Sequence, residues 1–193
     1  MTDPSPWRRL LALEMRQLGD LPLEQRLLIA PADIERRVKE LGEQISRDYA
    51  GREPVVVGIL KGAFIFMADL VRQVHVPLTI DFVGLASYVG TETSGEVRFT
   101  KSLSVPIEGR DVLVVEDIVD TGLTLARLIE HLHQMRPRSL AVCALVDKRE
   151  RRQVELPLNY HGFQLPHGFL VGYGLDCDEQ YRHLPGIYVL EGP

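Results

Sequence analysis

The sequence predicts an α/β fold in which a parallel sheet is covered by crossover helices. Short apolar runs, rich in β-branched residues, alternate along the chain with segments of helical periodicity. Uninterrupted apolar strands are typical of parallel sheets, because such strands are buried on both faces, and strand–helix alternation is typical of crossover connections. Polar clusters directly follow several of the runs, so a site is predicted at the carboxyl edge of the sheet.

The first predicted elements are a helix, a strand and a second helix. Apolar residues recur every three or four positions over 33–49, which predicts a helix with Asp33 as its cap. The segment around Pro54 ends this helix, and the run VVVGIL at 55–60 predicts a buried strand. A second helix is expected at 64–74.

The alternation continues towards the C-terminus. A helix is expected at 125–135, and strands are predicted at 78–87, 112–115, 140–146 and, as a fifth strand, 169–174. The stretch from Tyr88 to Lys101 is polar, contains two glycines and has no apolar periodicity. It therefore predicts a long connection, which in a compact domain is usually either a functional lid or disordered.

The length of 193 residues predicts one domain over 23–193, preceded by an N-terminal extension over 1–22. The extension predicts a short surface helix that ends at Pro22. No apolar stretch approaches the roughly 20 residues needed to span a bilayer, and no signal-peptide core is present. The two cysteines suggest no disulfide framework. A cytoplasmic protein with no membrane partner is expected.

The net charge of −5 argues against a protein that grips nucleic acid through its whole surface. A local basic pocket remains compatible with this charge. The six histidines show no ligand pattern, so zinc is not expected.

Two adjacent acids, Glu116 and Asp117, directly follow the apolar run at 112–115. At a strand end they could hold a ribose diol, either directly or through a magnesium ion. The alternative is that they only complement a helix dipole. The apolar run in front and the Asp-Thr-Gly triplet behind favour the site.

The residues after these acids predict an anion cradle at the start of a helix. Backbone N–H groups from 120–124, the hydroxyls of Thr121 and Thr124, and the small Gly122 suit a phosphate monoester. No GxxxxGK[ST] motif is present, so this is not a nucleoside-triphosphate P-loop.

The stretch VLVVEDIVDTGLT resembles the phosphoribosyl-pyrophosphate-binding motif of type I phosphoribosyltransferases. From about residue 24 to the C-terminus the chain resembles, within that group, the hypoxanthine (hypoxanthine–guanine) phosphoribosyltransferases. Several motifs in the correct order carry the resemblance: RVKELGEQISRDYAG, GILKGAFIFMADLVR, SY at 87–88, DK at 147–148 and FLVGYGLDCDEQYRHLP. It implies the type I phosphoribosyltransferase fold, a parallel sheet with a small hood built from N- and C-terminal segments, and a homodimer or homotetramer.

The resemblance also implies roles for the acidic turn. Glu116 and Asp117 would bind the ribose hydroxyls and Mg²⁺, and Asp120 would exchange a proton near purine N7. The 5′-phosphate would be held by Asp120, Thr121, Gly122, Leu123 and Thr124.

Further residues are assigned by the same resemblance. On the purine side, Lys148 would reach the exocyclic oxygen, Phe169 would stack on the base, the Leu170 backbone would read its edge, and Asp176 would bind a second Mg²⁺. At the other end, pyrophosphate would contact Lys61, Gly62 and Arg182, and the lid would open at Ser87 and Tyr88.

The implied reaction is purine salvage. It transfers 5-phosphoribosyl from 5-phospho-α-D-ribose 1-diphosphate to N9 of a 6-oxopurine, hypoxanthine and/or guanine, giving IMP or GMP and pyrophosphate. Fixed positive charge at Lys61 and Arg182 suits the leaving group, and a lysine donor at 148 selects a 6-oxo over a 6-amino purine. The alternatives are a phosphoribosyltransferase for another base, or a nucleic-acid-binding regulator on the same fold.

Some residues depart from the family pattern or stay outside the predicted site. Cys177 stands where tyrosine is common and His167 where an acid is usual, which puts base preference in doubt. The basic residues after Lys148 are expected at the surface or rim: Arg149, Arg151 and Arg152.

Overall fold

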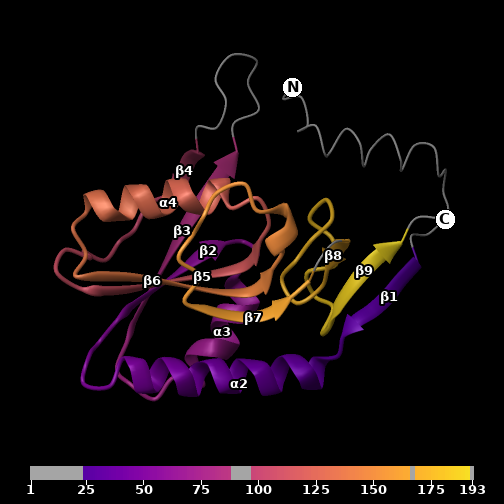
Figure 1. The fold of residues 1–193 in the computed structure, drawn as a ribbon, viewed down its shortest axis with the longest axis horizontal. Helices are drawn as coiled ribbons and strands as arrows, with labels where there is room; N and C mark the ends of the chain where they lie inside the picture. The colour runs from indigo at the N-terminus through magenta and orange to yellow at the C-terminus, as the bar shows by residue number, and fades with distance from the viewer. Residues whose placement is uncertain (1–23, 88–96, 166–167, 192–193) are drawn as a thin grey trace, which may run out of the picture.

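The computed structural model describes residues 24–87, 97–165 and 168–191 and confirms the predicted α/β class. Its main sheet has six strands in the order β4-β3-β2-β5-β6-β7, and all neighbours are parallel except β3 and β4. Figure 1 shows this sheet between helices. The elements of the sheet and its helices are α2 (Pro31–Asp48), β2 (Val55–Leu60), α3 (Phe64–Val71), β3 (Thr79–Ser87), β4 (Val97–Lys101), β5 (Asp111–Val119), α4 (Leu123–Gln134), β6 (Ser139–Asp147), the 3-10 turn η1 (Arg149–Arg151) and β7 (Tyr160–Gln164).

The strand order reverses between β2 and β5. From β2 the chain crosses over to β3 on one side, whereas β5 is followed by β6 and β7 on the other side. In an open parallel sheet the crevice beyond the carboxyl ends of two such strands is where ligands bind. The loop after β2 and the acidic end of β5 flank this crevice.

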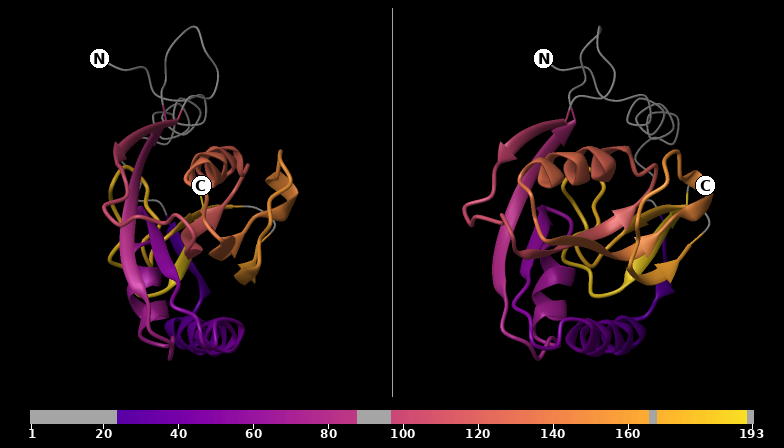
Figure 2. Two further views of the ribbon diagram at one scale, coloured as in Figure 1. Left: turned by 90° about the vertical axis from the view of Figure 1, so that its left-hand side faces the viewer. Right: turned by 60° about the vertical axis from the view of Figure 1, so that its left-hand side comes forward.

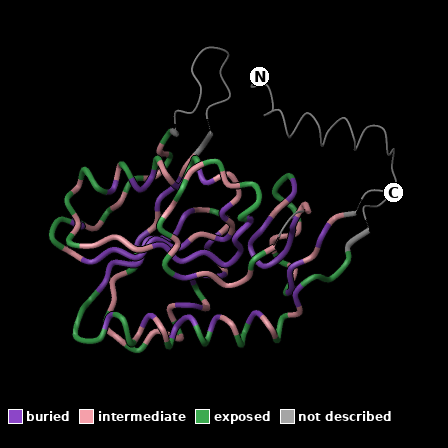
Figure 3. Tube along the Cα trace, in the orientation of Figure 1, coloured by how far each residue is buried: buried purple, intermediate pink, exposed green. Residues whose placement is uncertain are grey.

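Two apolar clusters fill the space between sheet and helices. Helices α2 and α3 pack on one face, where Leu41 and Phe66 are fully buried, and α4 covers the other face, with Leu128 fully buried. Figure 2 shows α4 opposite α2 and α3, and Figure 3 shows that buried residues concentrate in the central strands. Side chains alternate between the clusters along β2, Val56 facing one and Val57 the other. The continuous apolar runs therefore reflect burial on both faces.

A second, smaller sheet joins the two ends of the described chain. Its antiparallel order is β1 (Glu24–Ile29), β9 (Ile187–Glu191) and β8 (Phe169–Val171). The prediction that 169–174 forms a fifth strand of the parallel sheet was wrong, because β8 lies in this small sheet and the fifth parallel strand is β7. Strands β1, β7 and β9 were not predicted; each has only five or six residues, and polar side chains interrupt β1 and β7.

Three local expectations also need correction. The end of the expected long connection, Val97–Lys101, is strand β4, whose residue Phe99 packs partly buried against the α4 cluster. Helix α2 begins at Pro31 with Ala30 as its cap, so Asp33 lies in the first turn and pairs with Arg36. Helix α3 ends at Val71 rather than at residue 74. Within the described residues, no helix is both long and apolar enough to cross a bilayer.

The base of the β3–β4 hairpin is held by a buried carboxylate. Asp81 accepts hydrogen bonds from the backbone N–H groups of Phe82, Ser104 and Val105 and from Lys101 Nζ at 3.0 Å. Burial opposes ionisation of this side chain, but the four donors outweigh it and lower the pKa of Asp81 to about 2. A carboxylate with this many donors stabilises the fold as long as it stays ionised.

Replacing Asp81 by asparagine is expected to lower the free energy of unfolding by about 2 kcal/mol at pH 7. Because the folded pKa lies below the unfolded value near 3.9, the contribution is complete above about pH 4 and is lost as the pH falls towards 2. Urea unfolding of both proteins between pH 7 and pH 3 should show the difference shrinking with acid. The exposed Asp33→Asn variant is the control, with a change under about 0.5 kcal/mol. A difference independent of pH would contradict this role.

Candidate active site

The two adjacent acids lie within the last part of β5, since the strand extends to Val119. Asp117 is buried and Glu116 is half-buried, and the Asp117 N–H donates to Glu116 Oε1 at 3.1 Å. Burial raises the pKa of both carboxyls, and the neighbouring negative charge of Asp117 raises that of Glu116 further, well above its ordinary value. Two carboxylates desolvated side by side are unfavourable until a cation or a hydrogen-bond donor joins them.

The loop after β2 approaches these acids through a glycine. A Cβ built on Gly62 would lie 1.8 Å from Asp117 Oδ2, so a larger residue cannot occupy this position without displacing the carboxylate. Gly174, with φ of 100°, faces Gly62 from the other side, where a Cβ would lie 2.2 Å from the Gly62 carbonyl oxygen. The loops after β2 and after β8 therefore meet the end of β5 at one point.

Positive charge reaches this point from two segments. Arg182 Nη2 lies 2.9 Å from Asp176 Oδ1, and its Nη1 donates to the Gly174 carbonyl at 2.7 Å. Lys61 Nζ lies 2.9 Å from Glu179 Oε2. Both cations are thus held by acids of the loop after β8. The sequence analysis had not singled out Glu179, although it lies within the stretch FLVGYGLDCDEQYRHLP, because the pattern of an exposed loop acid does not indicate its partner.

These groups line a cavity of about 460 Å³. Of the predicted site residues it includes Lys61, Gly62, Glu116, Asp117, Asp176 and Arg182, and it adds Glu179, Thr100, Lys101 and residues of β2 and β3. Its walls carry both signs of charge, with the acids of β5 on one side and cations on the other. A ligand bearing an anionic group and bound cations fits this pattern.

The predicted phosphate cradle forms the start of α4. Gly122, with φ of 82°, is the N-cap, and the first helical bond runs from the Ala126 N–H to the Gly122 carbonyl at 2.9 Å. The N–H groups of the preceding first turn have no intrahelical acceptor by geometry. Thr121 is half-buried, and its carbonyl accepts from the Gln153 N–H. A backbone hydrogen bond from the segment after β6 therefore holds the cradle in place.

Asp120 lies at the end of β5 and contacts the basic run. Its Oδ2 is 3.2 Å from Arg151 Nη1, whereas its Oδ1 is buried without a hydrogen-bond partner among the described residues. Arg151 was expected at the surface or rim, and its side chain is indeed 54% exposed. The sequence analysis did not predict its pairing with Asp120, because a run of basic residues does not indicate which of them contacts another segment.

Lys148 is buried, and its Nζ donates to the Gly168 carbonyl at 2.7 Å. Burial lowers the pKa of the Lys148 amine, and the charge of Asp120 opposes this shift. Since Gly168 directly precedes β8, this bond brings Lys148 to the start of the strand with Phe169, which is half-buried, and Leu170, which is buried. The predictions for the N-terminal extension over 1–22, for the lid from Tyr88 to residue 96 and for His167 lie outside the described residues; Ser87 is the last residue of β3.

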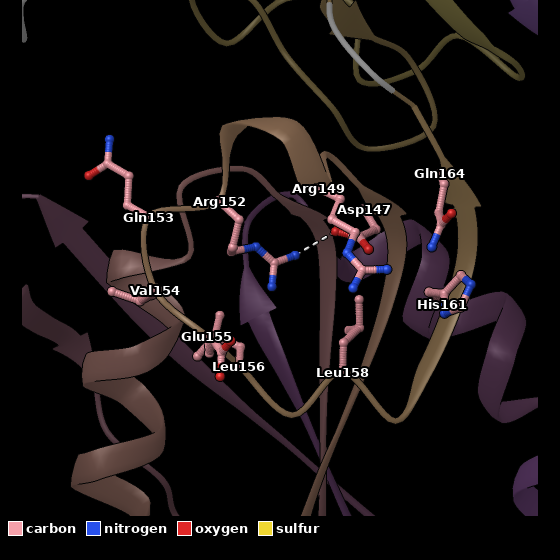
Figure 4. Close-up of a pocket in the computed structure, with 10 residues that line it drawn as sticks. All are labelled: Asp147, Arg149, Arg152, Gln153, Val154, Glu155, Leu156, Leu158, His161 and Gln164. Atoms are coloured by element: carbon pink, nitrogen blue, oxygen red, sulfur yellow. Dashed lines mark hydrogen bonds and ion pairs between the residues drawn. The ribbon is translucent and has the colours of Figure 1, made fainter.

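A second cavity, of about 530 Å³, lies between the segment after β6 and β7 (Figure 4). None of the predicted site residues is among the described residues that line it. Arg152, expected at the surface or rim, is 14% exposed here and pairs with the buried Asp147. The surface expectation for Arg152 was wrong, because this ion pair and contact with the phosphate cradle keep the side chain inside. Cys177, like Cys143, is buried.

Comparison with known proteins shows close relatives. A model of the phosphoribosyl transferase domain family matches residues 28–178. The hypoxanthine phosphoribosyltransferase of Salmonella typhimurium is 48% identical over 164 residues, covering 83% of this chain and 92% of that protein. The hypoxanthine-guanine phosphoribosyltransferase of Aquifex aeolicus is 46% identical over 168 residues, covering 86% and 94%.

Solved structures show the same likeness. A crystal structure of a hypoxanthine-guanine phosphoribosyltransferase from Bacillus anthracis is 47% identical, has a TM-score of 0.82, and is matched over 88% of this chain and 98% of that chain. A hypoxanthine phosphoribosyltransferase from Staphylococcus aureus is 44% identical with a TM-score of 0.83, matched over 88% and 92%.

Proposed function

Because the chain belongs to the phosphoribosyltransferase family, within the group of hypoxanthine and hypoxanthine–guanine phosphoribosyltransferases, we propose that it is a purine-salvage enzyme. It transfers 5-phosphoribosyl from 5-phospho-α-D-ribose 1-diphosphate to N9 of hypoxanthine and/or guanine. The bond from C1′ to the leaving oxygen breaks, pyrophosphate departs with the electron pair, and the purine loses a proton. The observation that carries this proposal is that the acid pair of β5 and two cations, Lys61 and Arg182, line one cavity, while the phosphate cradle directly follows the same strand.

The phosphorylated sugar is assigned to the acid pair within β5 and to the turn that leads from β5 into α4. The first turn of α4 directs N–H groups at the 5′-phosphate, helped by the hydroxyls of Thr121 and Thr124, while Glu116 and Asp117 face the ribose diol. This arrangement would orient C1′ towards the cavity at 61–62.

The residues present fit Mg²⁺. Glu116 and Asp117 offer only oxygen donors, and burial raises the pKa of both carboxyls, so a divalent cation would stabilise their ionised forms in place of water. Among the described residues, no group of three His, Cys, Asp or Glu side chains closes a metal site. The ion would therefore be shared with substrate oxygens and water, as Mg²⁺ prefers, and Asp176 is assigned to a second ion. When bound, Mg²⁺ neutralises the charge of the leaving pyrophosphate.

Pyrophosphate is assigned to Lys61, Gly62 and Arg182. Lys61 pairs with Glu179, and Arg182 pairs with Asp176 and Glu179, so substrate phosphates would compete with these acids for the two cations. Fixed positive charge near the leaving oxygen stabilises the charge that develops there.

The purine is assigned to the segment between β6 and β8. Lys148 would exchange its bond to the Gly168 carbonyl for the 6-oxo group, with Phe169 stacking and the Leu170 backbone reading the edge of the base. Asp120, whose buried Oδ1 has no partner within the described residues, would exchange the proton near N7. A 6-amino purine would turn its own donor towards Lys148, which disfavours adenine.

Further assignments complete this proposal. The small sheet of β1, β8 and β9 would be the hood over the base, within one domain over 23–193. Ser87 and Tyr88 would open the lid, and the protein would act as a cytoplasmic homodimer or homotetramer without nucleic-acid or membrane partners. A nucleic-acid-binding regulator, or transfer to another base, remains the competing hypothesis.

One assay decides among these functions. Purified protein is offered hypoxanthine, guanine, xanthine, adenine and uracil in turn with the diphosphate sugar and Mg²⁺, and pyrophosphate release is followed. Release with hypoxanthine or guanine, and not with adenine or uracil, is expected. Release only with adenine or uracil, or with none of the bases, would refute the proposal.

Replacing Lys148 by alanine is expected to raise KM for the purine by about 10–100-fold, the size of one lost hydrogen bond to a charged group. KM for the diphosphate sugar should change by less than about twofold, because the Lys148 side chain donates to the Gly168 carbonyl, next to the start of β8, and not to the phosphate cradle. Steady-state kinetics with each substrate varied in turn measures both constants. Arg149→Ala removes the next, exposed cation and should change neither. Equal losses for both substrates would contradict the assignment.

A further inference from the structure

The loop after β8 carries two residues of the candidate site, Asp176 and Arg182, on a backbone with unusual conformations. Tyr173 adopts φ of 50°, a left-handed value that side chains other than glycine seldom take. Its side chain is 8% exposed. Such a conformation persists only where surrounding contacts hold it in place.

The contact that holds Tyr173 comes from helix α3. The Tyr173 hydroxyl donates a hydrogen bond to Asp69 Oδ2, and the other oxygen of Asp69 pairs with Arg72. Burial, followed by the hydrogen bond to Asp69, raises the pKa of the Tyr173 hydroxyl, so it remains a donor at neutral pH. Helix α3 begins at Phe64, two residues after Gly62. The same rigid helix thus connects to both sides of the 460 Å³ cavity.

The backbone on either side of Tyr173 is tied to Arg182 and Gly62. The Tyr173 N–H donates to the Leu184 carbonyl at 2.8 Å, and the Gly174 N–H donates to the Arg182 carbonyl at 3.0 Å. Arg182 returns a bond to the Gly174 carbonyl, and Gly174 lies against the Gly62 carbonyl. A displacement of Tyr173 therefore moves the guanidinium of Arg182 relative to Gly62.

We propose that Tyr173 and Asp69 are positioning residues, whose hydrogen bond sets the spacing between the two walls of the cavity, 60–62 and 174–182. The inference rests on the proposed function, which assigns the pyrophosphate group to these walls. Neither side chain is among the residues that line the cavity, so both act through others. Loss of the bond loosens the pyrophosphate end and leaves the purine end, built from the segments at 148 and 168–170, unaffected.

The chain contains a matched control for this bond. Tyr160, also buried, donates its hydroxyl to Asp48 Oδ2 at 2.9 Å and so links strand β7 to helix α2. Both tyrosines lose the same group when they are changed to phenylalanine. Only Tyr173 lies on the loop that carries Asp176 and Arg182, so a general loss of rigidity and a specific loss of positioning can be told apart.

The test compares Tyr173→Phe, Tyr160→Phe and wild type by steady-state kinetics and by calorimetric titration with pyrophosphate and Mg²⁺. For Tyr173→Phe we expect KM for the diphosphate sugar and Kd for pyrophosphate to rise about tenfold, with KM for the purine within about twofold of wild type. Tyr160→Phe should lower the unfolding midpoint without raising KM for the diphosphate sugar relative to KM for the purine. Asp69→Asn keeps an acceptor for the tyrosine hydroxyl, so its KM and Kd values should stay near those of wild type. Asp69→Ala removes the acceptor at the helix surface and should raise the same two constants as Tyr173→Phe. It therefore tests the bond even if Tyr173→Phe folds poorly.

The outcomes separate the two proposals. Unchanged pyrophosphate affinity in Tyr173→Phe and Asp69→Ala, or equal changes in Tyr160→Phe, would overturn the positioning role while the enzyme stays active. Wild-type protein that binds pyrophosphate but transfers to no purine would overturn the proposed function alone, because the calorimetric arm still decides the positioning role. Wild-type protein that does not bind pyrophosphate would overturn both.

Discussion

Replacing Asp120 by asparagine is expected to lower turnover by about 10²–10⁴-fold, the usual contribution of a general acid or base, while nucleotide binding is kept. Asparagine preserves the shape of the side chain and cannot accept the purine proton. The buried Oδ1 of Asp120 has no partner among the described residues, so the substitution breaks no bond there. The variant loses the ion pair with Arg151, which at a half-exposed site contributes under about 1 kcal/mol.

Two control variants make this result specific. Asp147→Asn changes a buried aspartate at the end of the neighbouring strand, which is likewise paired with an arginine. It should lower stability and leave turnover close to wild type. Arg151→Ala removes the ion pair alone and should change turnover far less than Asp120→Asn. Single-turnover kinetics measures turnover in each variant, and product-nucleotide binding is measured in parallel. Turnover like that of wild type in Asp120→Asn would show that Asp120 does not exchange the purine proton.

Replacing Gly62 by alanine is expected to lower kcat/KM by about 100-fold, the effect of misplacing reacting groups by about 1 Å. The added methyl group would overlap the position of Asp117 Oδ2, so the carboxylate and the loop must separate. The acid pair and the pyrophosphate end would both shift, and KM for the diphosphate sugar should rise more than KM for the purine.

Gly58→Ala is the matched control, since this glycine lies on strand β2, four residues before Gly62. Its Cβ would meet Met67 Sδ at 2.3 Å and the ring of Phe82 at 3.0 Å, both side chains of the core. It should therefore lower the unfolding midpoint without changing the ratio of the two KM values. Similar kinetics in both variants would mean that Gly62 matters only for folding.

The central strands could be predicted from sequence because burial on both faces requires a continuous run of apolar residues. The apolar runs at 55–60, 112–115 and 140–146 each lie within a strand of the main sheet. The edge strands could not be predicted in this way. Strand β4 alternates Arg98 and Thr100 with Phe99, because only one of its faces packs on the protein.

The site residues also divide into those that local sequence places and those that only contacts between distant segments place. The acid pair and the cradle are adjacent in sequence, and a strand followed by a helix places them by local geometry alone. The pairing of Arg151 with Asp120, the burial of Arg152 and the hold of Glu179 on Lys61 depend on contacts between distant segments. A basic or acidic run gives no periodicity from which such contacts could be inferred.

The sequence by itself determined the fold class and the position of the acid pair and the helix start at the end of β5, because these depend on the order of residues along the strands and one turn. Only the tertiary structure decided that Gly62, Asp117 and Gly174 meet within van der Waals contact, and that Tyr173 is held by Asp69 across 104 positions of the chain. The physical reason is that close approach between separate segments is set by the packing of whole layers, which no local pattern records.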